Sequence, residues 1–167
     1  AQYYFSKLIN TETKYAKTAQ YYSAYIAYQN GLYKAALNGF NHLISDEQFG
    51  SIIPYYITQI YFFQQSYNEL IAFASPVLET VITSRKAEVN RLLAEAYYRT
   101  DDFENAIIHF TAYDEQVDQV TPIFNFLLGQ SYFKVGEFEN AINYLEKVNS
   151  SADSISQHAT YCLGASY

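Results

Sequence analysis

The chain has 167 residues, which fits one compact domain or a short stretch of a repeat array. Half of its residues are hydrophobic and 16% are charged, and this balance excludes an intrinsically disordered chain. The net charge of −7 argues against nucleic acid as a partner, because a protein that grips phosphates normally carries a basic surface.

Few residues in the chain are suited to metal binding or catalysis. The single cysteine, Cys162, cannot form an internal disulfide, and the three histidines are dispersed without ligand spacing. The sequence contains no Gly-x-Ser-x-Gly elbow, no phosphate-binding glycine loop and no His-Glu-x-x-His. We therefore predict a protein that is not an enzyme and that needs neither a cofactor nor a metal.

The uncharged stretch 48–68 is interrupted by glutamine, asparagine, glycine and proline. A transmembrane helix needs about 20 mostly apolar residues, so we predict a buried helix of a soluble protein here and no membrane span. The start of the chain lacks a signal-peptide pattern, and we expect any targeting segment to lie outside this sequence.

A spacing of small and aromatic residues recurs along the chain with a period near 35. The fullest copy comprises Gly129, Tyr132, Gly136, Phe138, Ala141, Leu145 and Val148. Further copies begin at Ala94 and Ala24, and a weaker copy begins at Thr58. The equivalent positions, which lie 35, 34, 36 and 35 residues apart, are Ala1, Ala36, Leu70, Ala106 and Ala141.

Each copy has the pattern of two helices joined by a turn. Steps of three and four residues place the recurring positions on one helical face, and Gly31, Asp101 and Gly136 break the pattern between helices. Thr121 followed by Pro122 predicts a helix start. Pro76 predicts a kink or an end of its helix and irregular geometry over residues 74–85.

We expect the small residues of the pattern to let neighbouring helices approach closely and most of the aromatic rings to form the core. The small residues are Ala24, Ala94, Gly129, Ala36, Ala106 and Ala141.

Two segments, AEAYYRTDDFENAIIHF (94–110) and GQSYFKVGEFENAINYL (129–145), resemble the consensus of the tetratricopeptide repeat. Ala27 and Leu70 depart from that consensus, which usually has Tyr and Ala there. The resemblance implies an all-α, right-handed superhelix of antiparallel helix pairs, forming a single domain. Its expected parts are a half-unit at 1–16, full units at 17–50, 51–86, 87–121 and 122–156, and a half-unit at 157–167.

Two other repeat families have similar periods. Pentatricopeptide repeats bind RNA and tend to be basic, so the acidity and the small-residue pattern count against them. Sel1-like repeats are not a better match.

The resemblance implies a protein or peptide partner that lies in a concave groove formed by the first helices. The expected groove residues are Tyr21, Tyr25, Tyr28, Gln29, Tyr55, Gln59, Phe62, Phe63, Glu88, Arg91, Glu95, Tyr98, Arg99, Phe126, Gln130, Phe133 and Lys134, with Tyr161 from the trailing half-unit.

These groove positions change in character along the chain, since only five charged residues lie between Thr18 and Ser84. We therefore hypothesise an apolar or aromatic ligand segment at Tyr21–Phe63 and a polar or acidic part near Arg91 and Arg99. The alternative is that Glu88, Arg91, Glu95 and Arg99 pair with one another along one helix. The Lys/Asn clamp by which chaperone adaptors of the family hold a C-terminal carboxylate is not reproduced.

A non-enzymatic protein-binding scaffold is thus the predicted function. The alternatives are self-assembly through open array ends, an accessory domain of a longer envelope or signalling protein, and, less favoured, a sugar-binding groove. The Tyr-, Asn- and Gln-rich composition resembles bacterial repeat proteins of the cell envelope, so a bacterial periplasmic or envelope location is the expectation.

Overall fold

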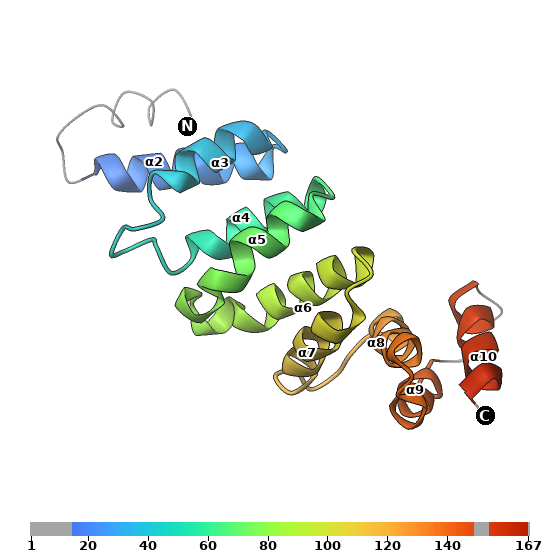
Figure 1. The fold of residues 1–167 in the computed structure, drawn as a ribbon. Coiled ribbons are helices and arrows are strands. Elements are labelled where there is room, and N and C mark those ends of the chain that lie inside the picture. Colours follow the sequence, from blue (N-terminus) through green and yellow to red (C-terminus); the bar gives the residue numbers. More distant parts are fainter. Residues whose placement is uncertain (1–14, 149–153, 167) are drawn as a thin grey trace. The chain divides into compact units, whose positions relative to one another are not determined.

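The computed structural model describes residues 15–148 and 154–166, and all of the regular structure in these ranges is helical (Figure 1). The predicted all-α fold of paired helices is confirmed for this part of the chain. Most of the predicted half-unit at 1–16 lies outside the described residues. Contacts divide the chain into an N-terminal unit, Ala1–Lys86, and a C-terminal unit, Ala87–Tyr167, and each is described by itself.

The described residues of the N-terminal unit form two helix pairs and the start of a further helix. Helix α2 packs on α3, α3 on α4, and α4 on α5 (Figure 1). The elements are α2 (Ala16–Gln29), α3 (Tyr33–Asn41), α4 (Ile53–Phe63), α5 (Tyr67–Val77), the 3-10 helix η1 (Leu78–Thr80) and the first residues of α6 (Thr83–Arg99).

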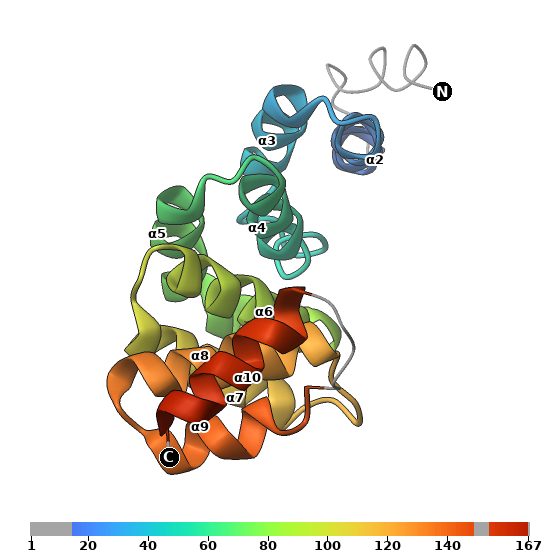
Figure 2. The ribbon, with the colours of Figure 1, turned by 90° about the vertical axis from the view of Figure 1, so that its right-hand side faces the viewer.

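The C-terminal unit continues with α6, and four more helices follow within its described residues. Helix α8 packs on α7 and α9, and α10 contacts both α8 and α9, across which it runs in Figure 2. These helices are α7 (Phe103–Asp114), α8 (Pro122–Val135), α9 (Phe138–Leu145) and α10 (Ser154–Ser166).

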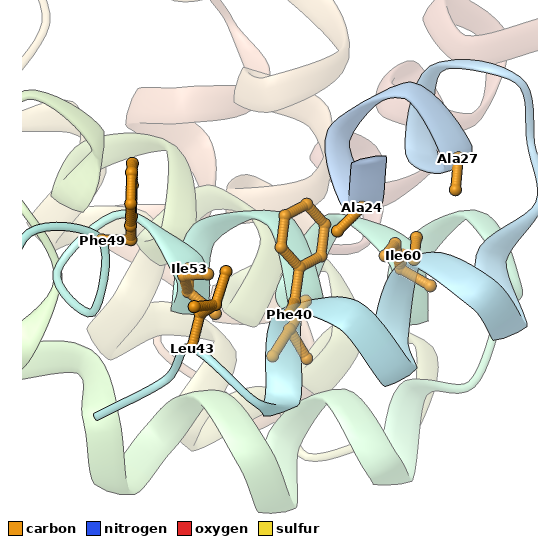
Figure 3. Packing of buried hydrophobic residues seen from close by; sticks show 9 residues of the cluster. Ala24, Ala27, Phe40, Leu43, Phe49, Ile53 and Ile60 are labelled. Carbon is orange, nitrogen blue, oxygen red and sulfur yellow. The ribbon is translucent and has the colours of Figure 1, made fainter. Parts of the chain in front are cut away.

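The core of the N-terminal unit is built from side chains of α2, α3 and α4 and the loop before α4. Figure 3 shows the fully buried ring of Phe40 near the centre of this cluster, with Leu43 and Ile53 on one side and Ala24 on the other. Burying one large apolar side chain stabilises the fold by roughly 1.5–3 kcal/mol, so this cluster is a main source of stability for the helix pairs.

Small residues set the distance between paired helices. All six small positions of the sequence pattern are buried, as predicted. A Cβ added at Gly39 of α3 would lie 2.7 Å from the Cβ of Ala24 on α2, and one added at Gly129 of α8 would lie 2.7 Å from Cγ of Leu145 on α9. The backbones therefore pass so close that a larger residue at these points would force the pair apart.

The turns between the first and second helices share one geometry in all four copies of the repeat. The turn residues have positive φ angles, namely Gly31 at 72°, Gln65 at 56°, Asp101 at 60° and Gly136 at 81°. In each turn the next backbone N–H donates back to the carbonyl oxygen five residues earlier over 2.9 Å, as from Leu32 to Ala27 and from Glu137 to Tyr132. This is the Schellman arrangement that ends a helix on a left-handed residue.

The predicted helix boundaries are also present. The hydroxyl of Thr121 accepts a hydrogen bond from the backbone N–H of Phe124 over 3.3 Å, and Pro122 is the first residue of α8. Helix α5 ends one residue after Pro76, at Val77, and η1 follows it. Because α6 already begins at Thr83, the irregular stretch is shorter than the predicted 74–85.

The left-handed turn predicts opposite effects of glycine and alanine substitutions. A non-glycine residue at positive φ costs roughly 1–2 kcal/mol, so Gln65→Gly should stabilise the protein by about 0.5–1 kcal/mol in urea unfolding after the entropy lost by glycine. Gly31→Ala should destabilise it by about 1 kcal/mol through φ alone, since a Cβ there meets no atom within 4 Å.

The neighbouring residue provides the control for this prediction. Gln64 has a right-handed backbone (φ −81°), so Gln64→Gly should destabilise the protein by about 0.5–1 kcal/mol. Equal effects of glycine at positions 64 and 65 would contradict the assignment of left-handed geometry to Gln65.

Candidate protein-interaction surfaces

Tyrosines of α2 and α4 form a continuous aromatic surface in the N-terminal unit. We name Tyr21, Tyr25, Tyr28 and Tyr56 the tyrosine face; each of these side chains is half-buried. The ring of Tyr56 lies 5.6 Å from Tyr25 and 5.4 Å from Tyr28, measured between centroids. The hydroxyl of Tyr21 donates to that of Tyr56 over 3.3 Å. The rings are thus fixed by one another and by the core beneath them.

The underside of the tyrosine face is anchored in the core. The ring of Tyr56 stacks on Phe40 with a centroid distance of 5.2 Å, and Tyr21 stacks on Phe49 at 4.5 Å. Offset ring pairs of this kind contribute about 0.5–1.5 kcal/mol beyond the area they bury. The rings of Tyr21 and Tyr56 therefore each pack against the core, and the part of each ring that stays exposed can contact a partner.

A hydrogen-bonded chain ties α2 to α4 beside the tyrosine face. The hydroxyl of Tyr28 donates to Oε1 of Gln59 over 2.6 Å, and Nε2 of Gln59 donates to the hydroxyl of Tyr55 over 2.9 Å. The guanidinium of Arg85 lies over the Tyr55 ring, 4.8 Å from its centroid. Burial raises the pKa of Tyr28 to about 12, so its hydroxyl stays protonated at neutral pH.

The C-terminal unit repeats this arrangement. The hydroxyl of Tyr98 on α6 donates to Oε1 of Gln130 on α8, and Nε2 of Gln130 lies 3.0 Å from Nε2 of His158 on α10. Tyr28 and Tyr98 occupy the same place in the sequence repeat, and so do Gln59 and Gln130. The Tyr–Gln pair is therefore a recurring link between first helices of successive repeats.

Two of the predicted groove residues belong to the interior and not to the surface. Tyr55 and Gln130 are each only 9% exposed. The Tyr55 hydroxyl bonds to Gln59 of its own helix, whereas Gln130 bonds to Tyr98 of α6. They support the surface and have little area to offer a partner. Residues Tyr21, Tyr25, Tyr28, Gln59, Phe62, Glu88, Arg91, Glu95, Tyr98, Phe126 and Phe133 are half-buried, whereas Gln29, Phe63, Arg99, Lys134 and Tyr161 are exposed.

Phe63 is the most prominent apolar side chain beside the tyrosine face. Its ring is at the end of α4, stacks on Tyr33 at 6.1 Å and lies 6.4 Å from Tyr28, yet the residue remains 52% exposed. Beside it, Leu32, Tyr33 and Gln64 line an open depression of about 720 Å³ around the first turn. An exposed ring next to a hollow is the kind of feature that an apolar partner side chain can cover.

Arg91, near which the sequence predicted a polar or acidic part of the ligand, pairs with acids of its own helix. Arg91 makes two hydrogen bonds to Glu88, at 3.0 and 2.8 Å, and a further one to Glu95. Helical neighbours at three- and four-residue spacing thus satisfy its guanidinium, which is the alternative the sequence left open. The hydrogen bond to Glu88 raises the pKa of Arg91, while burial raises the pKa of Glu95 above its ordinary value.

Phe126, Phe133 and Tyr161 contact rings of their own unit. Phe126 lies edge-on to His158 at 5.7 Å, and His158 is 6.1 Å from Tyr161. Phe133 is 5.8 Å from Phe138 at the start of the next helix. These rings link α8 to α9 and α10, so their first role is packing.

Nothing among the described residues indicates a metal site or a reactive thiol. No three His, Cys, Asp or Glu side chains among the described residues are grouped so that they could hold a metal ion. The acids around the turn before α7 have a structural role, since Asp102 caps α7 by accepting from the N–H of Asn105 over 3.2 Å. Cys162 is buried, and burial raises the pKa of its thiol.

A transmembrane helix needs about 20 mostly apolar residues. In the described ranges, no helix reaches the length and hydropathy that this requires.

The sequence analysis missed several residues on which these surfaces depend. The predicted groove included Tyr55 but not its neighbour Tyr56. The buried face of α4 contains Ile53, Ile57 and Ile60, and Tyr56 lies next to this face. Phe49 lies in the loop before α4, where helical periodicity gives no information. Tyr113 and Phe124, which line the cavity beside Arg91, could have been found from the repeat pattern only as core residues.

A comparison with known protein families matches residues 124–154 to the tetratricopeptide repeat. The match begins at the third residue of α8, covers α9 and ends at the first residue of α10. The paired helices of the fold agree with the class of repeat that the sequence indicated. No curated protein matches the chain.

Residues 124–154 therefore form a tetratricopeptide repeat, and the paired helices of the other described residues are consistent with a fold built from such repeats. Proteins of this family act in general as scaffolds for protein–protein interaction and not as enzymes, and this is the function that the match indicates.

The Tyr28–Gln59–Tyr55 chain predicts a measurable loss of stability. Gln59→Leu removes the acceptor of one hydroxyl and a donor to the other, and it should destabilise the protein by about 1–3 kcal/mol in urea unfolding. Gln29→Leu, at an exposed position of the neighbouring helix, should change stability by less than about 0.5 kcal/mol.

A double substitution tests the cause of that loss. Tyr28→Phe combined with Gln59→Leu should recover part of the stability, because no hydroxyl of residue 28 then needs an acceptor. The repeat itself uses this solution, with Phe62 and Phe133 at the positions equivalent to Tyr28. Purely additive losses would argue against the hydrogen-bonded chain.

Proposed function

We propose that this chain is a docking scaffold whose tyrosine face, extended by Phe63, receives an apolar segment of a protein partner. The observation that carries the proposal is the exposed ring of Phe63 next to four half-buried tyrosines on α2 and α4. The first helices of tetratricopeptide repeats are the ones expected to line the binding groove, and both α2 and α4 are first helices.

The rigidity of the tyrosine face favours binding. The rings are already stacked and hydrogen-bonded, so a partner loses little affinity to ordering these side chains. Tyrosine also combines a large contact area with a hydroxyl that can bond to a peptide backbone, and it is enriched among residues that dominate binding energies.

The low charge of the N-terminal unit indicates what the partner segment is made of. No charged residue belongs to the tyrosine face, and the depression next to Phe63 has Lys34 as its charged member. An apolar or aromatic stretch of the partner loses no ion hydration on reaching this surface, whereas a strongly charged stretch would lose hydration without gaining ion pairs.

Selection from a random peptide library displayed on phage tests this proposal without knowledge of the native partner. Peptides rich in Phe, Tyr, Leu or Ile should be enriched on the intact protein. Tyr25→Ala and Phe63→Ala should each weaken the selected peptides by about tenfold or more, as expected for truncated hot spots.

Two matched variants serve as controls for this selection. Tyr22→Ala removes a 46%-exposed tyrosine of the same helix, and Ile108→Ala removes a 60%-exposed side chain of α7. Neither should change binding, and circular dichroism verifies that all four variants are folded. Peptides that bind the Tyr25 and Phe63 variants as well as the intact protein would refute the proposed surface.

A further inference from the structure

A second hollow with different chemistry lies in the C-terminal unit, between α6, α7 and α8. It has a volume of about 320 Å³, and its apolar lining includes Phe110, Phe124 and Leu127, all of them buried. Ile123, which is 50% exposed, and Tyr113 also line it. We name this hollow the Arg91 cavity. Its volume is at the lower end of the range of ligand pockets and suits one long side chain.

The polar side of the Arg91 cavity is formed by a hydrogen-bonded cluster of charged side chains. Arg91 and Glu95 both line it, and Glu88 holds the same guanidinium from the preceding turn of α6. Within the hydrogen-bonded cluster, two carboxylates share one cation, which leaves one negative charge in excess. Arg99, which is exposed to water, also acts on Glu95 and offsets part of the rise in pKa that burial causes. Oε1 of Glu95 accepts from Arg91, and the structure gives Oε2 of Glu95 no partner among the described residues.

The distribution of charge along the chain points in the same direction. Residues 87–167 contain twelve acidic and four basic residues, a net charge of −8, whereas residues 1–86 contain five acidic and six basic residues, a net charge of +1. The excess negative charge of the protein thus belongs to the unit that contains the Arg91 cavity. Such a field attracts cations and repels anions over roughly a Debye length, about 8–10 Å.

We propose that the Arg91 cavity binds a lysine or arginine side chain of the docked partner. The methylene stem lies against Phe110, Phe124 and Leu127, and the cationic head bonds to Glu95. Long basic side chains combine an apolar stem with a charged end in this way. The inference rests on the proposed scaffold function, since the side chain belongs to a docked protein segment, but it concerns a different surface from the tyrosine face.

A cationic occupant satisfies the site better than the acidic one predicted from the sequence. An acidic ligand would have to displace Glu88 or Glu95 from Arg91 and would leave a half-buried carboxylate without its partner, at a cost of a desolvated charge. A basic side chain leaves those pairs intact and supplies the bond that Oε2 of Glu95 lacks. Burial raises the pKa of Glu95, and a bound cation would counteract this effect by favouring the charged carboxylate.

Three synthetic peptides provide the probe. They share the sequence Gly-Ser-Leu-Ser-Xaa-Ser-Leu-Ser-Gly with blocked ends, and Xaa is lysine, norleucine or glutamate. Norleucine keeps the stem of lysine and lacks its ammonium group. Titration of the isotope-labelled full chain by NMR measures each affinity and identifies the amides that respond.

The lysine peptide should bind about fivefold or more tightly than the norleucine peptide, and the glutamate peptide should bind most weakly. The amides of Glu95, Tyr113 and Ile123 should shift. Glu95→Gln should reduce the preference for lysine over norleucine to near unity, whereas Arg91→Gln should increase it. Glu139→Gln, an equal change of charge at an exposed position of α9, should leave it unchanged.

Several outcomes would overturn the inference. They are equal affinities for the lysine and norleucine peptides, no binding by any of the three, or a stronger preference for glutamate. A preference for lysine that survives Glu95→Gln would also overturn it, since binding would then depend on overall charge alone. If the phage-selected peptides still depend on Tyr25 and Phe63, the proposed function survives such a failure.

Discussion

The close approach of paired helices is the constraint on which the rest of this structure depends. Gly39 faces Ala24 between α3 and α2, and Gly129 faces Leu145 between α8 and α9, with no room for an additional methyl group. The left-handed Schellman turns reverse the direction of the chain between the two helices of each pair, so that the second helix can run back along the first. Because the backbones meet so closely, large side chains are excluded from these contacts and fill the remaining space between and beside the pairs.

The high aromatic content follows from this division of space. Rings such as Phe40 and Phe110 fill the layer between helices, while the half-buried rings of Tyr21, Tyr25 and Tyr28 lie beside this layer. Tyrosine in this layer needs hydrogen-bond partners, and glutamines of the next first helix supply them. The same side chains thus join successive repeats and form a rigid aromatic surface that is available to a protein partner.

Much of the fold could be predicted from the sequence because the same local sequence pattern recurs in several repeats. The turn at Asp101, the cap at Thr121 and the helix end near Pro76 all follow from local chemistry and were confirmed. The candidate surface was less predictable. Helical spacing shows which residues share a face but does not tell whether Tyr55 or Tyr56 is covered by a neighbouring helix. It also could not decide whether Arg91 bonds to its own helix or to a ligand. The repeat-unit boundaries, the groove as a whole, self-association and a bacterial origin remain predictions.

Photo-crosslinking from the surface itself is the most direct measurement of docking on the tyrosine face. A photoreactive phenylalanine analogue is placed at position 63 or, as the reference, at the equally exposed position 108 on α7, and each protein is irradiated in extract of its native cells. Docking on the tyrosine face predicts that position 63 crosslinks to a discrete protein, that the same product is weak or missing at position 108, and that Tyr25→Ala suppresses it. Equal crosslinking from both positions, or a product that persists with Tyr25→Ala, would contradict it.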